Sequence, residues 1–188
     1  MLDSTHLNDI ITILEQDGLL LLPSDTTWAV VGDALSGIAH VRLSRLKERE
    51  IKRPFSLLVD SIDLLKRYVP HIHPRVETLL FYHERPLTVI YDRPANLPPH
   101  CVSPERTVAI RITMDPLLKQ IIHTLDRPLL TSSANHTGKP YPVSFNDIPP
   151  EILDGVDRVI RPSHYKQPAE PSVLVRYSNR GELIFLRE

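Results

Sequence analysis

The chain changes from apolar to polar within one stretch, Leu129-Leu130-Thr131-Ser132-Ser133-Ala134-Asn135-His136-Thr137-Gly138-Lys139-Pro140. Its apolar start predicts the end of a buried strand, and the small polar residues after it predict a loop at the edge of a sheet. In open α/β sheets, ligands bind outside the carboxyl ends of strands. Hydroxyl, amide and backbone N–H groups at such a place can hold a phosphate or a carboxylate. The same residue types are common in turns, so a polar loop without a ligand is the alternative interpretation.

The length and composition indicate one soluble domain. The chain has 188 residues, and we expect a single domain over residues 1–188. No apolar run approaches the roughly 20 residues that cross a bilayer, and the start of the chain lacks the features of a signal peptide. The single cysteine, Cys101, excludes an internal disulfide and a multi-cysteine zinc site. We therefore expect a cytoplasmic protein without a membrane partner.

The charge of the chain is nearly balanced, since 22 Lys and Arg stand against 23 Asp and Glu for a net charge of −1. Proteins that bind nucleic-acid phosphates usually have a basic excess, so the overall charge gives no support to dominant RNA or DNA binding. A local basic patch stays open as an alternative. The 18 prolines are spread along the chain, which indicates rigid connections rather than a disordered linker.

Helical and extended patterns alternate along most of the chain. Helical spacing of apolar residues marks segments 7–14, 38–46, 64–65, 76–80 and 117–125, and apolar or β-branched runs mark strands over 19–22, 56–59, 87–91, 107–112 and 129–132. Asp115-Pro116 is a strong helix start, because Asp caps a helix and Pro fits its first position. Segments 172–177 and 182–186 flank a hairpin sequence, Ser178-Asn179-Arg180-Gly181. The pattern predicts an α/β fold, a twisted mixed sheet in one domain with a C-terminal β-hairpin.

A second strand end opens into polar residues in the stretch Pro23-Ser24-Asp25-Thr26-Thr27-Trp28, which follows the first predicted strand directly. This stretch offers small hydroxyls, one carboxylate and an aromatic ring that can form the wall of a pocket. The alternative interpretation is a turn followed by a tryptophan of the core.

Basic residues occur at two further places. Lys47-Glu48-Arg49 lies at the end of the predicted helix 38–46. The helix dipole favours cations at that end, so these residues alone are weak evidence for a site. Arg111 is more informative because it interrupts the apolar strand 107–112. A guanidinium at such a position needs a partner, which is either a structural carboxylate or a bound anion.

With these stretches in this order, the chain resembles the YrdC-like threonylcarbamoyl-adenylate synthase family. The resemblance rests on Pro23-Ser24-Asp25-Thr26 and the aromatic residue after it, Lys47-x-Arg49, Pro86-Leu87-Thr88, Val108-Ala109-Ile110-Arg111, Ser132-Ser133-Ala134-Asn135, Pro171-Ser172-Val173-Leu174-Val175 and Leu186-Arg187. It runs from about Gly18 to the C-terminus, and it is the sequence order of the motifs that makes it specific.

The resemblance implies a fold and a reaction. Members of this family have a twisted α/β sheet around a concave cavity. They condense L-threonine, bicarbonate and ATP into L-threonylcarbamoyl-adenylate and release pyrophosphate. ATP brings Mg²⁺ with it, and no metal bound tightly by the protein is implied. Other proteins then transfer the threonylcarbamoyl group to tRNA. The chain is similar to the members of the family that consist of this domain alone.

The resemblance also implies roles for single residues. Lys47 and Arg49 are the implied catalytic residues, because phosphoryl transfer needs positioning and cationic stabilisation more than a protein nucleophile. The implied ligands of ATP and its phosphates are Lys47, Arg49, Thr88, Arg111, Ser133, Asn135, Ser172 and Arg187. Threonine is expected to contact Ser24, Thr26, Trp28 and Arg111.

The chain departs from the family pattern at several positions. Ala29 and Val31 stand where the family usually has Gly, Glu50 follows Lys47-x-Arg49 where Pro is usual, and His83-Glu84-Arg85 replaces Trp-Pro-Gly. Glycine permits a close backbone approach that larger residues resist, so the first two changes are expected to narrow the cavity. The alternative function is that of a divergent relative without synthase activity, which binds double-stranded RNA, tRNA or a nucleotide on the same concave surface.

Three other features of the sequence bear on function: a group of basic residues, a pair of histidines and the single cysteine. A basic strip suited to RNA could be formed by Arg42, Arg45, Lys47, Arg49, Lys52 and Arg53. His71-Ile72-His73 places two imidazoles on one side of an extended segment, but without a third ligand at useful spacing we expect no metal site. Cys101 has no basic neighbour in the sequence that would activate its thiol, so we expect no catalytic cysteine.

Overall fold

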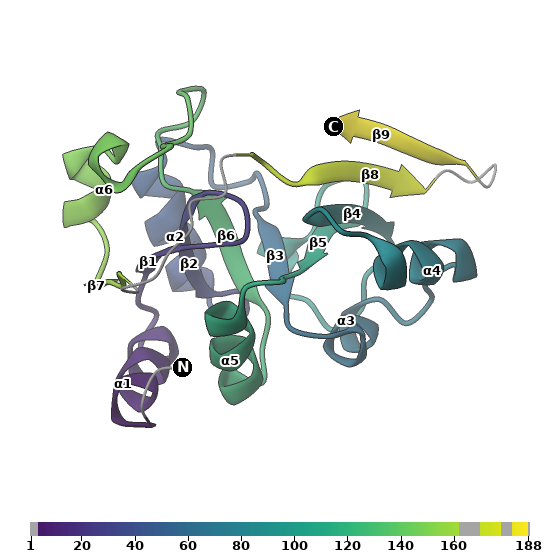
Figure 1. Cartoon of the computed structure of the whole chain (residues 1–188), viewed down its shortest axis with the longest axis horizontal. Helices are drawn as coiled ribbons and strands as arrows, with labels where there is room; N and C mark the ends of the chain where they lie inside the picture. Colours follow the sequence, from purple (N-terminus) through teal and green to yellow (C-terminus); the bar gives the residue numbers. More distant parts are fainter. Residues whose placement is uncertain (1–3, 162–169, 178–181, 188) are drawn as a thin grey trace.

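The centre of the molecule is a mixed β-sheet with helices packed against it (Figure 1). The computed structural model describes residues 4–161, 170–177 and 182–187. Within these residues the sheet has 9 strands in the order β7-β1-β2-β6-β3-β5-β4-β8-β9. The strands are β1 (Leu20–Pro23), β2 (Trp28–Asp33), β3 (Ser56–Val59), β4 (Leu87–Asp92), β5 (Thr107–Ile112), β6 (Leu129–Ser133), β7 (Arg158–Val159), β8 (Val173–Tyr177) and β9 (Leu183–Arg187).

Parallel and antiparallel pairs are combined in this sheet. β1 and β7, β3 and β5, and β4 and β8 run parallel, whereas the other neighbouring strands run antiparallel. The predicted mixed α/β sheet is therefore confirmed, and β8 and β9 form the expected antiparallel pair at the C-terminal end. The predicted hairpin turn at 178–181 lies outside the described residues.

The helices are α1 (Ser4–Glu15), α2 (Gly37–Leu46), α3 (Ile62–Tyr68), α4 (Pro74–Tyr82), α5 (Pro116–Leu125) and α6 (Pro150–Asp154), with short 3-10 turns η1 (Pro99–Cys101) and η2 (Phe145–Asp147). In the view of Figure 1, α1, α5 and α3 lie along the lower side of the sheet, away from β8 and β9. The start of α5 is as predicted. The side chain of Asp115 accepts a 2.9 Å hydrogen bond from the N–H of Leu118, and Pro116 is the first helical residue.

The predicted helix over 38–46 is confirmed as α2, but the apolar face expected from Ile38, Val41 and Leu46 is not the one that is buried. Ile38 is 61% exposed. The buried residues of α2 are Ala39, His40, Leu43 and Ser44. An imidazole can occupy a core position when its polar atoms have partners. His40 meets this condition, because its Nε2 forms a 2.7 Å hydrogen bond with the carbonyl oxygen of Ile51.

The strand β2 was not predicted from the sequence, which suggested only a turn and a tryptophan here. All six of its residues are buried, so it lacks the alternation that marks a half-buried strand. Gly32 is required by close packing, since a Cβ there would lie 3.0 Å from Leu19 Cδ2 and 3.3 Å from the Cβ of Ala39. β2 pairs with β1 as a hairpin, and their connecting turn carries the polar residues 24–27.

Leu58 tests the contribution of the core to stability. It lies in β3 between β5 and β6, and its side chain is fully buried. We expect Leu58→Ala to lower the free energy of unfolding by about 2–5 kcal/mol, because the truncation removes apolar contacts and leaves a cavity. Denaturant unfolding measures this loss. Ile38→Ala, at an exposed position, is the control and should change the free energy by less than about 0.5 kcal/mol. Equal losses in the two variants would contradict this assignment of the core.

Candidate functional site

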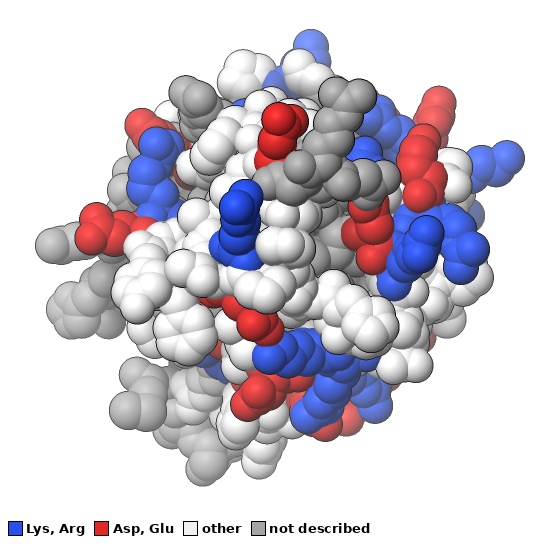
Figure 2. Space-filling view, turned by 90° about the vertical axis from the view of Figure 1, so that its right-hand side faces the viewer, with Lys and Arg blue, Asp and Glu red and all other residues white. Residues whose placement is uncertain are grey.

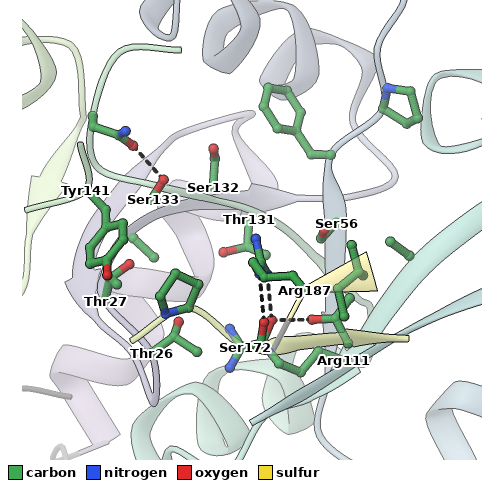
Figure 3. Close-up of a pocket in the computed structure, with 18 of the residues that line it drawn as sticks. Thr26, Thr27, Ser56, Arg111, Thr131, Ser132, Ser133, Tyr141, Ser172 and Arg187 are labelled. Carbon is green, nitrogen blue, oxygen red and sulfur yellow. Dashed lines mark hydrogen bonds between the residues drawn. The ribbon is translucent and has the colours of Figure 1, made fainter. Parts of the chain in front are cut away.

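A cavity of about 360 Å³ lies beside the central strands (Figure 3). On three strands its lining residues include pairs spaced two positions apart, which are Thr88 and Ile90, Ala109 and Arg111, and Thr131 and Ser133. Alternate residues of a strand point to the same face, so one face of the sheet forms the floor of the cavity. Its volume falls in the range of roughly 300–1,000 Å³ that is usual for small-molecule sites.

The walls of the cavity come from segments that are distant in the sequence. They include Thr26 and Thr27 from the β1–β2 turn, Arg49, Pro54 and Phe55 from the α2–β3 connection, Asn135 and Tyr141 from the loop after β6, and Ser172 and Arg187 near β8 and β9. Tyr141, Thr27, Ser56, Thr131 and Ser132 were not predicted as site residues. For the strand residues among them a signal exists, namely a hydroxyl residue directly beside buried aliphatic residues, as Thr131 is beside Leu130 and Ser56 beside Leu57.

Lys47 connects the end of α2 with the loop after β6. It is the C-terminal cap of α2 and is 2% exposed. Its Nζ donates hydrogen bonds to the carbonyl oxygens of Ser133 (2.6 Å) and Asn135 and to Oδ1 of Asn135 (3.0 Å). In addition, the backbone oxygen of Lys47 accepts hydrogen bonds from the N–H (3.0 Å) and Oγ1 (2.8 Å) of Thr137. Of the basic pair Lys47 and Arg49, it is thus Lys47 that directly contacts the loop carrying Ser133 and Asn135.

The environment of the Lys47 ammonium makes it easier to deprotonate. Burial, followed by the positive charge of Arg49, lowers the pKa of Lys47 to about 8. The ammonium donates to three oxygens and is not among the residues that line the cavity. Its direct effect is therefore on the shape of the loop that carries Ser133 and Asn135. Within this loop, Ser133 Oγ donates to Oδ1 of Asn135 at 2.5 Å.

Arg49 brings a guanidinium group to the cavity. Its Nη2 donates a 2.9 Å hydrogen bond to the carbonyl oxygen of Pro54, and its Cζ lies 5.0 Å from the centre of the Phe55 ring. Burial and the charge of Arg53 lower its pKa, although the group stays protonated in any solution a protein tolerates. Its Nε is buried and has no hydrogen-bond partner among the described residues. Because this atom is not exposed to the cavity, Arg49 can meet a ligand only through the other parts of its guanidinium, which line the cavity.

Arg111 has a structural carboxylate as its partner. Its Nη1 forms an ion pair with Oδ1 of Asp25, and the two side chains are 6% and 9% exposed. Asp25 also accepts hydrogen bonds from Thr113 Oγ1 (3.3 Å) and from the N–H of Met114 (2.9 Å). Of the two kinds of partner expected for Arg111, the structure thus provides the carboxylate, while the same guanidinium lines the cavity. Asp25 was not predicted as a site residue.

Thr88, Ser172 and Arg187 form a connected group at the cavity, as Figure 3 shows for Ser172 and Arg187. The hydroxyls of Thr88 and Ser172 are 2.7 Å apart. Arg187 donates from Nε to the carbonyl oxygen of Ser172 (2.9 Å) and from Nη2 to its hydroxyl (3.2 Å). Burial and the charge of Arg111 lower the pKa of Arg187. Two guanidinium groups thus lie close enough to repel each other, which favours an anion between them.

Ser24 and Trp28 do not line the cavity, whereas Thr26 does. Ser24 is fully buried, and its Oγ contacts Oγ1 of Thr26 at 2.9 Å and the carbonyl oxygen of Thr27 at 2.8 Å. Trp28 packs in the core with its ring edge-on to Phe145, the ring centres being 5.2 Å apart. These two residues can therefore shape the cavity only through their neighbours, by fixing the turn and the strand that follows it.

The departures from the family pattern leave the cavity open. Of the residues that differ, Ala29 lines the cavity and Val31 does not. Glu50 is exposed, and so is Arg85, which pairs with Glu170 at 3.2 Å. The expected narrowing is therefore confined to one methyl group at Ala29.

The described residues contain no cluster of three or more His, Cys, Asp and Glu side chains that could hold a metal ion. His73 caps α4 and stacks on Tyr177, with ring centres 4.3 Å apart. Burial raises the pKa of Cys101 to about 12, which leaves its thiol protonated and unreactive at neutral pH. A search of the described residues for membrane-spanning helices finds none that is long and apolar enough.

Comparison with known proteins agrees with the motifs. Residues 12–188 match the Sua5/YciO/YrdC family model, whose description reads "Telomere recombination". A threonylcarbamoyl-AMP synthase of Xanthomonas euvesicatoria pv. vesicatoria (strain 85-10) is 26% identical over 163 residues, which cover 85% of this chain and 87% of that protein. The threonylcarbamoyl-AMP synthase of Coxiella burnetii (strain RSA 331) is 27% identical over 135 residues, covering 71% and 73%.

Solved structures show the same fold. Sua5 of P. abyssi in complex with L-threonine superposes with a TM-score of 0.85 at 20% identity, covering 100% of this chain and 55% of that one. E. coli YciO superposes with a TM-score of 0.81 at 19% identity, covering 98% and 89%. This chain thus spans little more than half of the P. abyssi protein but most of YciO.

Proposed function

Because this chain belongs to the Sua5/YciO/YrdC family, we propose that it condenses L-threonine, bicarbonate and ATP into L-threonylcarbamoyl-adenylate and pyrophosphate. One observation carries the proposal. Arg49, Arg111 and Arg187 line one cavity together with the hydroxyl and amide groups of Ser133 and Asn135. Guanidinium groups bind phosphate and carboxylate oxygens in fixed geometry. The names of the synthase relatives and the threonine complex of P. abyssi Sua5 support the choice of substrates.

The proposed reaction needs charge stabilisation and positioning rather than a protein nucleophile. The amine of threonine takes up the carbon of bicarbonate with loss of water, giving a carbamate. A carbamate oxygen attacks the α-phosphorus of ATP, the bond from this phosphorus to the bridging oxygen breaks, and pyrophosphate leaves. Negative charge grows on the phosphate oxygens during this step. Mg²⁺ that arrives with ATP would neutralise part of this charge.

In the proposed reaction, each cationic side chain has its own part in stabilising charge and positioning the substrates. Arg49 binds the phosphates through the part of its guanidinium that lines the cavity. Arg187, held by Ser172, and Arg111, held by Asp25, bind further anionic oxygens in the same cavity. Lys47 keeps the Ser133–Asn135 loop in the shape that presents its hydroxyl and amide to the nucleotide. Such preorganised donors are worth more in a site that excludes water.

The threonine side of the proposed site is the β1–β2 turn. Thr26 lines the cavity directly, while Ser24 fixes Thr26 and Trp28 packs behind the turn. Arg111 lies close to this turn because Asp25 belongs to it. A threonine carboxylate at Arg111 and a threonine hydroxyl at Thr26 would satisfy both groups. Proteins that transfer the threonylcarbamoyl group to tRNA are the proposed downstream partners.

Pyrophosphate release tests the proposed function. The purified chain should release pyrophosphate only when threonine, bicarbonate, ATP and Mg²⁺ are all present, and each omission is its own control. Release that does not depend on threonine and bicarbonate would contradict the proposal. No release under any condition, with a folded chain, would favour the non-catalytic relative.

The alternative of an RNA-binding relative finds little support in the charges. Of the expected basic strip, Lys47 is buried and Arg42 is paired with Asp157 at 2.8 Å, so Arg45, Lys52 and Arg53 are the members left exposed. Figure 2 shows the face at the α4 end of the molecule, where Lys and Arg are interspersed with Asp and Glu rather than gathered. Phosphate-driven binding of double-stranded RNA or tRNA would weaken steeply with salt. A salt titration of RNA binding therefore distinguishes the two functions.

The pKa of Lys47 predicts a pH dependence with opposite signs for activity and stability. We expect kcat/KM to fall as the pH rises through about 8, because the neutral amine no longer holds three oxygens. In the unfolded chain the pKa returns to 10.5, so the unfolded state binds more protons between these values. The contribution of Lys47 to stability therefore rises with pH over that window. A pH–rate profile that stays flat well above pH 8 would contradict this role.

A further inference from the structure

Asp25 does not line the cavity itself, but it contacts Arg111, which does. It belongs to the β1–β2 turn and is not among the residues that line the cavity. Its carboxylate takes three contacts from the β5–α5 region, namely Arg111 Nη1, Thr113 Oγ1 and the N–H of Met114. Within the described residues, the polar contacts of the Arg111 side chain run from Nη1 to this carboxylate. The side of the guanidinium that carries the other N–H groups is therefore available to the cavity.

A guanidinium in this place would not hold its position without the carboxylate. Arg111 is 6% exposed at its side chain, and a buried cation without a partner is strongly destabilised. The charge of Arg111 also acts on Arg187, which lines the same cavity, so the two cations repel each other. The Asp25 carboxylate offsets this repulsion and holds the Arg111 guanidinium at its Nη1.

We propose that Asp25 is a positioning residue, which orients the Arg111 guanidinium so that its remaining N–H groups bind an anionic oxygen of the substrate. The inference rests on the proposed function, from which it takes the two sources of such an oxygen, a phosphate of ATP and the carboxylate of threonine. Displacement of a catalytic-site group by about 1 Å can cost about a hundredfold in rate. Loss of the Asp25 charge should therefore lower ligand affinity as well as stability.

The chain offers a control at the far end of β2, the strand that follows the turn of Asp25. Asp33, at the end of β2, is also a buried carboxylate that pairs with one arginine and one backbone N–H. It accepts from Arg127 Nη1 at 2.9 Å and from the N–H of Leu35 at 2.8 Å. Neither Asp33 nor Arg127 lines the cavity. Asp33→Asn therefore reports the effect of losing such a pair on the fold alone.

The test compares Asp25→Asn with Asp33→Asn by calorimetry, with ATP–Mg²⁺ and with threonine in separate titrations, and by pyrophosphate release. We expect Asp25→Asn to raise the dissociation constant of the ligand that Arg111 binds by about tenfold or more, whereas Asp33→Asn leaves both dissociation constants unchanged. A raised dissociation constant for ATP–Mg²⁺ would show that Arg111 holds a phosphate, and a raised one for threonine that it holds the threonine carboxylate. Asp25→Glu, which keeps the charge, should restore part of the affinity.

A double-mutant cycle separates positioning from a structural tie. If Asp25 acts through Arg111, adding Asp25→Asn to Arg111→Gln should weaken binding no further. The double variant also avoids an unpaired buried charge, so it is the form to use if Asp25→Asn alone does not fold. Equal affinities for Asp25→Asn and Asp33→Asn, or fully additive losses in the cycle, would overturn the role of Asp25 and leave the proposed function standing. A wild-type chain that binds neither ATP nor threonine would overturn both.

Discussion

Lys47→Ala is expected to lower kcat/KM for pyrophosphate release by about a thousandfold, which corresponds to about 4 kcal/mol of transition-state stabilisation. The variant loses a cation and the three hydrogen bonds that hold the carbonyl oxygens of Ser133 and Asn135 and the Asn135 amide. Buried oxygens without a donor cost about 1–3 kcal/mol each, so the loop is expected to rearrange. Steady-state kinetics well below the unfolding temperature measure the effect.

Lys52→Ala is the control for this prediction. Lys52 lies in the same α2–β3 connection, but it is exposed and does not line the cavity. Its loss should leave kcat/KM within about twofold of the wild type, as surface substitutions away from a site usually have small effects. Near-equal activities of the Lys47 and Lys52 variants would remove Lys47 from the site.

Arg49→Ala is expected to lower kcat by about 10²–10³-fold, because it removes a donor aimed at the place where negative charge develops. The substitution also removes the contact with the Phe55 ring and the hydrogen bond to the carbonyl oxygen of Pro54. Arg49→Lys should recover little activity, since an ammonium cannot present the planar fork of a guanidinium. Single-turnover measurement of pyrophosphate release distinguishes slow chemistry from weak binding.

Arg53→Ala provides the comparison for Arg49. Arg53 is exposed, and its charge contributes to the lowered pKa of Arg49, so its removal tests electrostatics without removing a cavity ligand. We expect its activity to stay close to that of the wild type. If both arginine variants lost activity to the same degree, the effect would belong to the basic loop as a whole and not to Arg49.

The sequence allowed the fold to be predicted where local signals are strong. Asp115-Pro116 marks the start of α5, and the apolar run at Leu129 marks β6, because capping and burial leave a pattern in neighbouring residues. β2 escaped prediction since a strand that is buried on both faces shows no alternation. The buried face of α2 was wrong because a hydrogen-bonded histidine takes a core position.

The candidate site was predictable only in part. The family motifs brought Lys47, Arg49, Ser133 and Asn135 into one prediction, and the structure brings them together. The position of Arg111 in an apolar strand showed that its guanidinium needs an anionic partner. The sequence did not identify Asp25 as this partner, because β1 and β5 are separated by three strands in the sheet. The contact forms only when the end of β5 and the residues after it meet the β1–β2 turn in the folded chain. Such a pair depends on tertiary structure and leaves no mark in local sequence.

The hydrogen bonds of the site join residues that are far apart along the chain. Lys47 and Asn135 are 88 positions apart, Arg111 and Asp25 are 86 apart, and Thr88 and Ser172 are 84 apart. Contacts of this kind close long loops, which slows folding. The strand pairs beneath the site close loops of similar length, as Thr88 with Leu174 does, so ligand affinity should return together with the sheet during refolding. A ligand that binds there also raises the melting temperature of the whole domain, because local opening cannot free it without separating distant strands.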